Sequence, residues 1–267
     1  MLKDITLGQY FPGGTAVHRL DPRTKLILTL VYIVALFVAR GIASYALMLL
    51  ALGCCVAASR VKARAIFKSI KPIIAVIAVT AALNVFFTPG TAIARVWVIT
   101  ITREGLIVAA YMVSRLIMLI SGTFLLTYTT SPIALTDGIE SLLAPLKKIR
   151  LPVHEFAMMM SIALRFIPTL IEETDKIMSA QKARGADFET GSLIRRARAM
   201  LPILIPLFIS AFRRADELAT AMESRCYHGG EGRTRMKKLS MSPGDYISLA
   251  GGTAVMLAVV LTNMAAA

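Results

Sequence analysis

The chain contains 267 residues, 56% of them hydrophobic and 17% charged, with a formal net charge of +14 at pH 7. Several runs are almost free of charge and long enough to cross the hydrocarbon core of a bilayer, which excludes a soluble globular domain. The basic excess lies in loops beside these runs, where it decides membrane topology, so it does not indicate nucleic acid as a partner. We predict an all-α integral membrane protein embedded in a lipid bilayer.

Five transmembrane spans follow in chain order from the apolar runs. The opening MLKDITLGQYFPGG lacks the apolar stretch and the small-residue cleavage site of a removable signal, so we expect it to remain as a cytoplasmic tail. The predicted spans are 25–39, 42–59, 66–87, 105–129 and 246–262. Between the third and fourth spans, β-branched residues alternate in ARVWVITITREG, which predicts an extended or hairpin segment on the outer face.

The distribution of Lys and Arg orients these spans. With five crossings, only Arg40, Arg95 and Arg103 fall on one side and Arg115 lies within a span, whereas the other 26 of the 30 basic residues share the opposite side. The positive-inside rule therefore places the N-terminus in the cytoplasm and the C-terminus outside. The predicted organisation is a membrane domain at 1–130 with four spans, a cytoplasmic domain at 131–239, and the last span at 240–267.

The interval between the fourth and fifth spans predicts amphipathic helices. Pro132 starts a short helix that Pro145 and Pro152 interrupt, and a long amphipathic helix, about 45 Å at 1.5 Å per residue, follows over 153–184 with a bend expected at Pro168. The next segments are predicted separately. They are a short basic element at 192–200, a buried run at 201–212 with two prolines that is too short to span, and a polar helix at 213–225.

A short internal repeat marks the ends of the two long amphipathic segments. With a constant offset of 41 positions, the first set of residues matches the second: Asp175, Ala180, Ala183 and Arg184 against Asp216, Ala221, Ser224 and Arg225. The small residue one turn before each arginine lies on the same helix face, so each tip can enter a groove on a partner. A purely structural alternative also exists, because arginine suits a helix C-terminus and Gly185 suits a left-handed cap.

Catalytic and metal-binding patterns are not found in the sequence. No GxxxxGK[ST] or GxSxG motif occurs, and the three histidines and three cysteines have no ligand or disulfide spacing. We therefore predict no enzyme activity, cofactor or metal, and we expect any ATP to be bound by another chain. Arg115 lies within the fourth span without an acidic residue in any span to pair with it, so it is either a functional polar site or a donor to backbone carbonyls.

These features resemble the transmembrane T component of energy-coupling factor transporters. The resemblance rests on PGGTAVHRLDPRTKL at 12–26, on the four-plus-one spans and on the paired tips. It implies a subunit of an ATP-driven importer of vitamins or other micronutrients in the prokaryotic cytoplasmic membrane, without ATPase activity of its own. The implied partners are two cytoplasmic ATPases, in whose grooves the tips dock, and a small substrate-binding membrane protein, the S component.

By this resemblance, the first docking motif is Ala183, Arg184 and Gly185. The second is Ser224, Arg225 and Cys226, where the family's pattern has Ala and Gly in place of the serine and the cysteine. Because cysteine does not favour the left-handed cap that glycine allows, we expect Cys226 to be helical and the second helix to continue toward Gly229. The alternative function is a self-contained secondary transporter or channel, which predicts polar residues in several spans.

Overall fold

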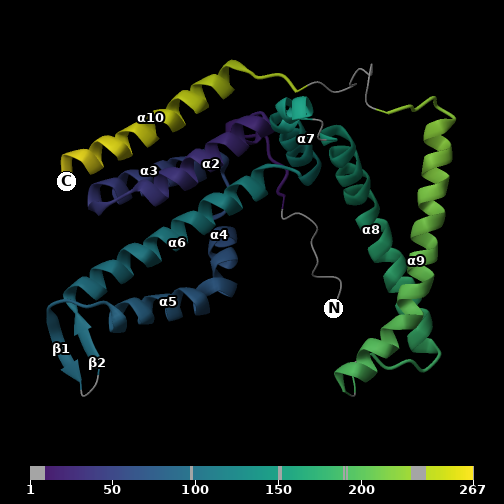
Figure 1. Ribbon diagram of the computed structural model, residues 1–267, viewed down its shortest axis with the longest axis horizontal. Helices are drawn as coiled ribbons and strands as arrows, with labels where there is room; N and C mark the ends of the chain where they lie inside the picture. The colour runs from purple at the N-terminus through teal and green to yellow at the C-terminus, as the bar shows by residue number, and fades with distance from the viewer. Residues whose placement is uncertain are drawn as a thin grey trace. The chain divides into compact units, whose positions relative to one another are not determined.

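The computed structural model describes residues 10–96, 99–149, 152–188, 190, 192–229 and 239–266, which are mostly helical (Figure 1). The prediction of an all-α membrane protein is confirmed. In chain order the elements are α1 (Ala16–Arg19), α2 (Pro22–Val38), α3 (Gly41–Ser59), α4 (Ala63–Ile70), the 3₁₀ turn η2 (Lys71–Ile73), α5 (Ile74–Phe87), β1 (Ala92–Val96), β2 (Ile99–Thr102), α6 (Arg103–Thr129), α7 (Pro132–Leu143), the 3₁₀ turn η3 (Ala144–Ile149), α8 (Val153–Ala183), α9 (Leu193–Glu223) and α10 (Pro243–Ala266).

Five helical segments are long and apolar enough to cross a membrane by length and composition. Four of them contain the predicted spans at 42–59, 66–87, 105–129 and 246–262. The predicted span at 25–39 lies on α2, which has only 17 residues and is not among the five. The fifth segment is instead α8, a helix within the region 131–239 that the distribution of basic residues predicted to be cytoplasmic.

The described chain divides into two compact units, one formed by 10–139 with 239–266 and the other by 140–229. In the first unit, α10 packs on α2 and α3, and α6 packs on α2, α3, α4 and α5. The core between these helices is apolar, because Leu36, Met48, Met118 and Val259 are all almost fully buried in it. The cytoplasmic placement predicted for 131–239 stays a prediction.

Polar contacts at both ends of α2 show that α10 runs parallel to it. At the start of α2, the backbone N–H of Asp21 donates to Asp245 Oδ1 at the start of α10, with 2.7 Å between nitrogen and oxygen. At the other end, Asn263 accepts from the N–H of Arg40 at 2.9 Å and donates to the carbonyl of Val38 at 2.8 Å. The starts of α2 and α10 therefore lie together, and so do their C-terminal ends, as the predicted orientation of the first and fifth spans requires.

The segment between α5 and α6 is a β-hairpin. Strands β1 and β2 pair antiparallel, with Arg95 opposite Thr100 and Val96 opposite Ile99. The hairpin that the alternating β-branched residues predicted is therefore confirmed. At its base, Thr102 caps α6 by accepting from the N–H of Gly105 at 3.1 Å.

In the second unit, α8 begins at Val153 as predicted and ends at Ala183, and it packs against α9. The division of 192–225 into three elements is wrong, because α9 is one helix of 31 residues with Pro202 and Pro206 inside it. Each proline removes one backbone donor, yet the helix continues through both. Ser192 caps its start by accepting from the N–H of Arg195 at 3.4 Å.

Candidate functional site

The end of α8 closes in a Schellman motif. The N–H of Gly185 donates to the carbonyl of Lys182 at 3.0 Å, and the N–H of Ala186 donates to the carbonyl of Gln181 at 3.0 Å. Gly185 has a φ of 85°, in the left-handed region that glycine enters without a steric penalty. The prediction of a left-handed cap at Gly185 is confirmed. The helix therefore ends at Ala183, with Arg184 as its C-cap and Gly185 as the left-handed residue that follows.

The end of α9 has the same motif, shifted by 41 positions. The N–H of Cys226 donates to the carbonyl of Glu223 at 2.8 Å, and the N–H of Tyr227 donates to the carbonyl of Met222 at 3.0 Å. Cys226 has a φ of 59°. Both the prediction of a helical Cys226 and that of a helix continuing toward Gly229 are wrong, because α9 ends at Glu223. The repeat seen in the sequence is thus also a repeat of backbone structure.

The left-handed conformation of Cys226 explains why the sequence misled. For a residue with a β-carbon this region costs about 1 to 2 kcal/mol, so propensity alone favours a helical cysteine. The two hydrogen bonds of the Schellman motif satisfy carbonyls that would otherwise lack partners, and they hold Cys226 in place. Non-glycine residues kept in this region are often found at functional sites.

The side chains at both tips face solvent. Arg184 and Arg225 are exposed, and no hydrogen bond or ion pair to either guanidinium occurs among the described residues. Ser224, where the first tip has Ala183, turns its hydroxyl back to donate to the carbonyl of Thr220 at 2.6 Å. The serine therefore presents a small surface with a satisfied hydroxyl, much as alanine does. Within the described ranges, each tip thus offers an unpaired guanidinium beside a small residue.

An ion pair joins the two helices that carry the tips. Arg214 on α9 donates to Glu173 on α8 with 3.0 Å between nitrogen and oxygen. These residues are also 41 positions apart, and their side chains are 36% and 23% exposed. Because the pair is partly solvated, its contribution to stability is about 0 to 1 kcal/mol. The pair is one polar contact within the packing of α8 against α9 in the second unit.

Arg115 belongs to the other unit and does not join the tips. Its Nη2 donates to the carbonyl of Ala39, the C-cap residue that follows α2, at 3.3 Å. The guanidinium carbon lies 5.9 Å from the ring centre of Phe37 and 5.7 Å from that of Tyr45. The arginine thus serves the C-terminal end of a helix, where a cation is favoured, and the carbonyl-bonding interpretation describes this contact.

The sequence analysis did not single out Asn263 and Asp245, the two polar residues that join α10 to α2. Asp245 comes just before the predicted last span and is almost fully buried. The only local signal was the presence of an acid and an amide at the two ends of an apolar run. No group of three or more His, Cys, Asp or Glu side chains suited to a metal ion occurs within the described ranges.

Comparison with known proteins identifies the family. The CbiQ family, described as cobalt transport protein, matches residues 13–236. The chain is 57% identical over 246 residues to the energy-coupling factor transporter transmembrane protein EcfT of Heliobacterium modesticaldum, with 92% of each chain covered. The EcfT proteins of Clostridium kluyveri and Bacillus subtilis are 55% identical over 250 residues and 49% identical over 246 residues, with 92% or more of each chain covered. The chain belongs to the family of energy-coupling factor transporter transmembrane proteins.

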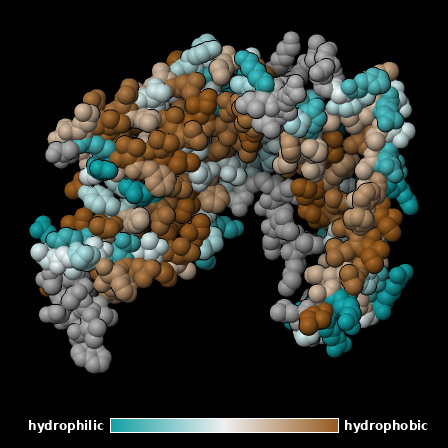
Figure 2. Space-filling model, in the orientation of Figure 1, coloured by the Kyte–Doolittle hydropathy of each residue, from teal (hydrophilic) through white to brown (hydrophobic). Residues whose placement is uncertain are grey.

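The family resemblance inferred from 12–26 and the paired tips is confirmed, and the chain is a multi-pass transmembrane component of a transporter. This energy-coupling factor subunit also presents an apolar face on its second unit. Brown apolar side chains follow α8 and α9 in Figure 2. The large ones that are at least half exposed are Phe156, Met159 and Met160 on α8 and Ile194, Met200, Leu201, Leu204, Ile205, Phe208, Ile209 and Phe212 on α9. The run at 201–212, predicted to be buried against lipid or a helix, is therefore largely uncovered within its own chain.

Proposed function

We propose that this chain is the coupling subunit of an ATP-driven importer and that its two tips dock on two cytoplasmic ATPase subunits. The observation that carries the proposal is the repeated Schellman motif, which ends two packed helices beside Arg184 and Arg225, two exposed arginines with no side-chain partner among the described residues. The hydrogen bonds, the arginine and the small neighbouring residue all recur with the same spacing between the two tips. A purely structural role for the arginines explains this shared spacing less well. A planar guanidinium in a shallow groove can bind carboxylates or carbonyls with two donors.

The apolar face of α8 and α9 supports the second part of the proposal. Side chains such as Phe208 and Phe212 are more than half exposed, and an uncovered apolar patch of this kind is typical of a surface that binds protein or lipid. We propose that this apolar face contacts the substrate-binding membrane subunit and the surrounding lipid. Motion of the ATPases would then pass through the tips and along α8 and α9 to the protein that carries the vitamin or other micronutrient.

The membrane orientation is part of the same proposal. The N-terminus lies in the cytoplasm, the C-terminus lies outside, and the tips face the cytoplasm of a prokaryotic cell. Parallel α2 and α10 support an odd number of crossings from the first to the last span. The basic residues clustered beside α3, α4 and the second unit support the inward side.

The test is co-purification of the ATPase subunits with Arg184→Glu, Arg225→Glu and the double variant. Each charged hydrogen bond contributes about 1.5 to 3 kcal/mol, so we expect each single variant to retain less ATPase and the double variant to retain none. Arg213→Glu is the matched control, because it reverses an exposed arginine well inside α9, away from both helix ends. Wild-type recovery of ATPases by the double variant would refute docking at the tips. Uptake by the lone chain in liposomes would favour the self-contained transporter.

A further inference from the structure

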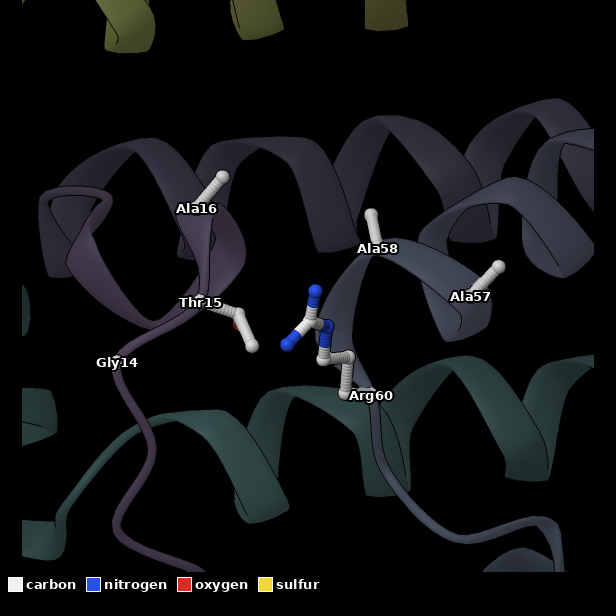
Figure 3. A pocket seen from close by; sticks show the side chains of 6 residues that line it. All are labelled: Gly14, Thr15, Ala16, Ala57, Ala58 and Arg60. Carbon is white, nitrogen blue, oxygen red and sulfur yellow. The ribbon is translucent and has the colours of Figure 1, made fainter.

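A pocket in the first unit lies where the start of α1 meets the end of α3. Its volume is about 680 Å³, and it is lined by Gly14, Thr15, Ala16, Ala57, Ala58 and Arg60. Figure 3 shows the Arg60 guanidinium directed toward Thr15. The hydroxyl of Thr15 also lies 3.5 Å from the carbonyl of Ser59, which ties the two walls together. The pocket is thus a small apolar hollow with one cationic group in it.

The backbone at Arg60 is unusual. Arg60 has a φ of 53° and follows directly on the last residue of α3, a left-handed position where glycine is the residue expected. Its N–H donates to the carbonyl of Ala57 at 3.2 Å, which ends the helix. Glycine would adopt this conformation without strain but would lack the charged side chain. The presence of arginine at a strained position therefore indicates that the side chain has a function.

A second arginine lies near the pocket. Nη2 of Arg19 is 4.0 Å from the point where a β-carbon on Gly14 would lie. No hydrogen bond or ion pair to the side chain of Arg19 or Arg60 occurs in the part of the chain that the structure describes. The sequence contains no Asp or Glu between Asp21 and Glu104, whereas Lys and Arg recur through this stretch. The residues that line the pocket include one arginine and no acid, so the pocket attracts anions.

An exposed apolar strip leads along α3 to the pocket. Leu50, Cys54 and Ala57 are spaced by four and three residues, so they share one helix face, and all three are exposed. Because α3 is one of the helices long and apolar enough to cross a membrane, this strip is an exposed apolar surface that suits an acyl chain. A ligand that fits both features has an anionic head at Arg60 and an acyl chain along the strip.

We propose that the pocket binds the phosphate of an anionic glycerophospholipid, with Arg60 as the main ligand and Arg19 as the second cation. The proposal rests on α3 spanning the membrane and not on docking of ATPases. Clusters of Lys and Arg next to a span attract anionic lipids in general, but the pocket and the left-handed backbone assign a specific role to Arg60. The occupant is a lipid and not a free anion because the walls beside the charge are alanines that continue into the apolar strip.

Native mass spectrometry of the purified full-length chain tests the proposal. The protein is titrated with phosphatidylglycerol and, separately, with phosphatidylcholine of the same acyl chains. We expect one phosphatidylglycerol to bind at least about tenfold more tightly than phosphatidylcholine, a difference of about 1.4 kcal/mol. In Arg60→Gly this preference should disappear, while the fold is retained because a φ of 53° suits glycine. Equal binding of the two lipids to the wild-type chain would overturn the proposal.

Lys68→Gln is the matched control, because it removes an exposed positive charge from neighbouring α4 outside the pocket. We expect it to keep the preference for phosphatidylglycerol. An equal loss in Lys68→Gln and Arg60→Gly would show diffuse charge attraction and refute a site. Displacement of the bound lipid by millimolar inorganic phosphate would show a free-anion site and refute the lipid. Co-purification of ATPases with Arg60→Gly should stay at the wild-type level, which separates this proposal from the docking proposal.

Discussion

Replacing Cys226 with glycine should stabilise the tip of α9. At a φ of 59°, cysteine carries a left-handed penalty of about 1 to 2 kcal/mol, which glycine lacks. Glycine loses about 0.5 to 1 kcal/mol more chain entropy on folding, so the difference lies between about 0 and 1.5 kcal/mol, and we expect a net gain near the middle of this range. Gly185→Val should have the opposite effect, because a φ of 85° is a strained position for a β-branched residue.

Hydrogen exchange of single amides measures these effects where they arise. The N–H of Tyr227 closes the second motif, and a gain of about 1 kcal/mol would slow its exchange about fivefold. Gly185→Val should speed exchange at Ala186, whose N–H closes the first motif. Gly251→Ala is the control, because this helical glycine has open space around it and α10 should tolerate alanine. Unchanged or faster exchange at Tyr227 in Cys226→Gly would refute the strained cap.

Three further outcomes are expected. A cysteine introduced at Thr91, in a background without the native cysteines, should react with an impermeant label from outside, and one at Asp187 only after the membrane is opened; the reverse pattern would invert the proposed orientation. Asn263→Leu should lower the free energy of unfolding by about 0.5 to 1.5 kcal/mol for each hydrogen bond lost, because its side chain bonds to the N–H of Arg40 and the carbonyl of Val38, as denaturation in detergent would show. If both tips bind one ATPase assembly, loss of either Arg184 or Arg225 should weaken binding by about 10²-fold or more in a titration, whereas independent sites would each keep their own affinity.

Hydropathy and local pattern were enough to predict most helices, because a membrane helix forms all its backbone hydrogen bonds within the segment. The length of α8, the hairpin before α6 and the cap at Gly185 followed from similar local signals. Two local rules misled, the helical propensity of cysteine at Cys226 and the helix-breaking tendency of proline. Proline was expected to interrupt 192–225, but α9 continues through Pro202 and Pro206.

The contacts that join α10 to α2 could not be predicted, because they link residues far apart in the chain. Asp21 and Asp245 are separated by 224 positions, and Arg40 and Asn263 by 223. No periodicity or local motif records which polar residue at a helix end meets which backbone group. An apolar run specifies that a helix enters the membrane, but its neighbour is chosen by side-chain packing and by such isolated polar contacts.

The repeat of the two tips shows how sequence and backbone can separate. At the last position of the motif the first tip has glycine and the second has cysteine, yet Gly185 and Cys226 both have positive φ and close the same pair of hydrogen bonds. Both tips thus share an abrupt helix end next to an exposed arginine. The residue in the left-handed position that closes the helix differs between them. If that end positions the guanidinium for a groove, the second tip carries the same geometry at a greater local cost, which is the expected result where function and not stability keeps the shape.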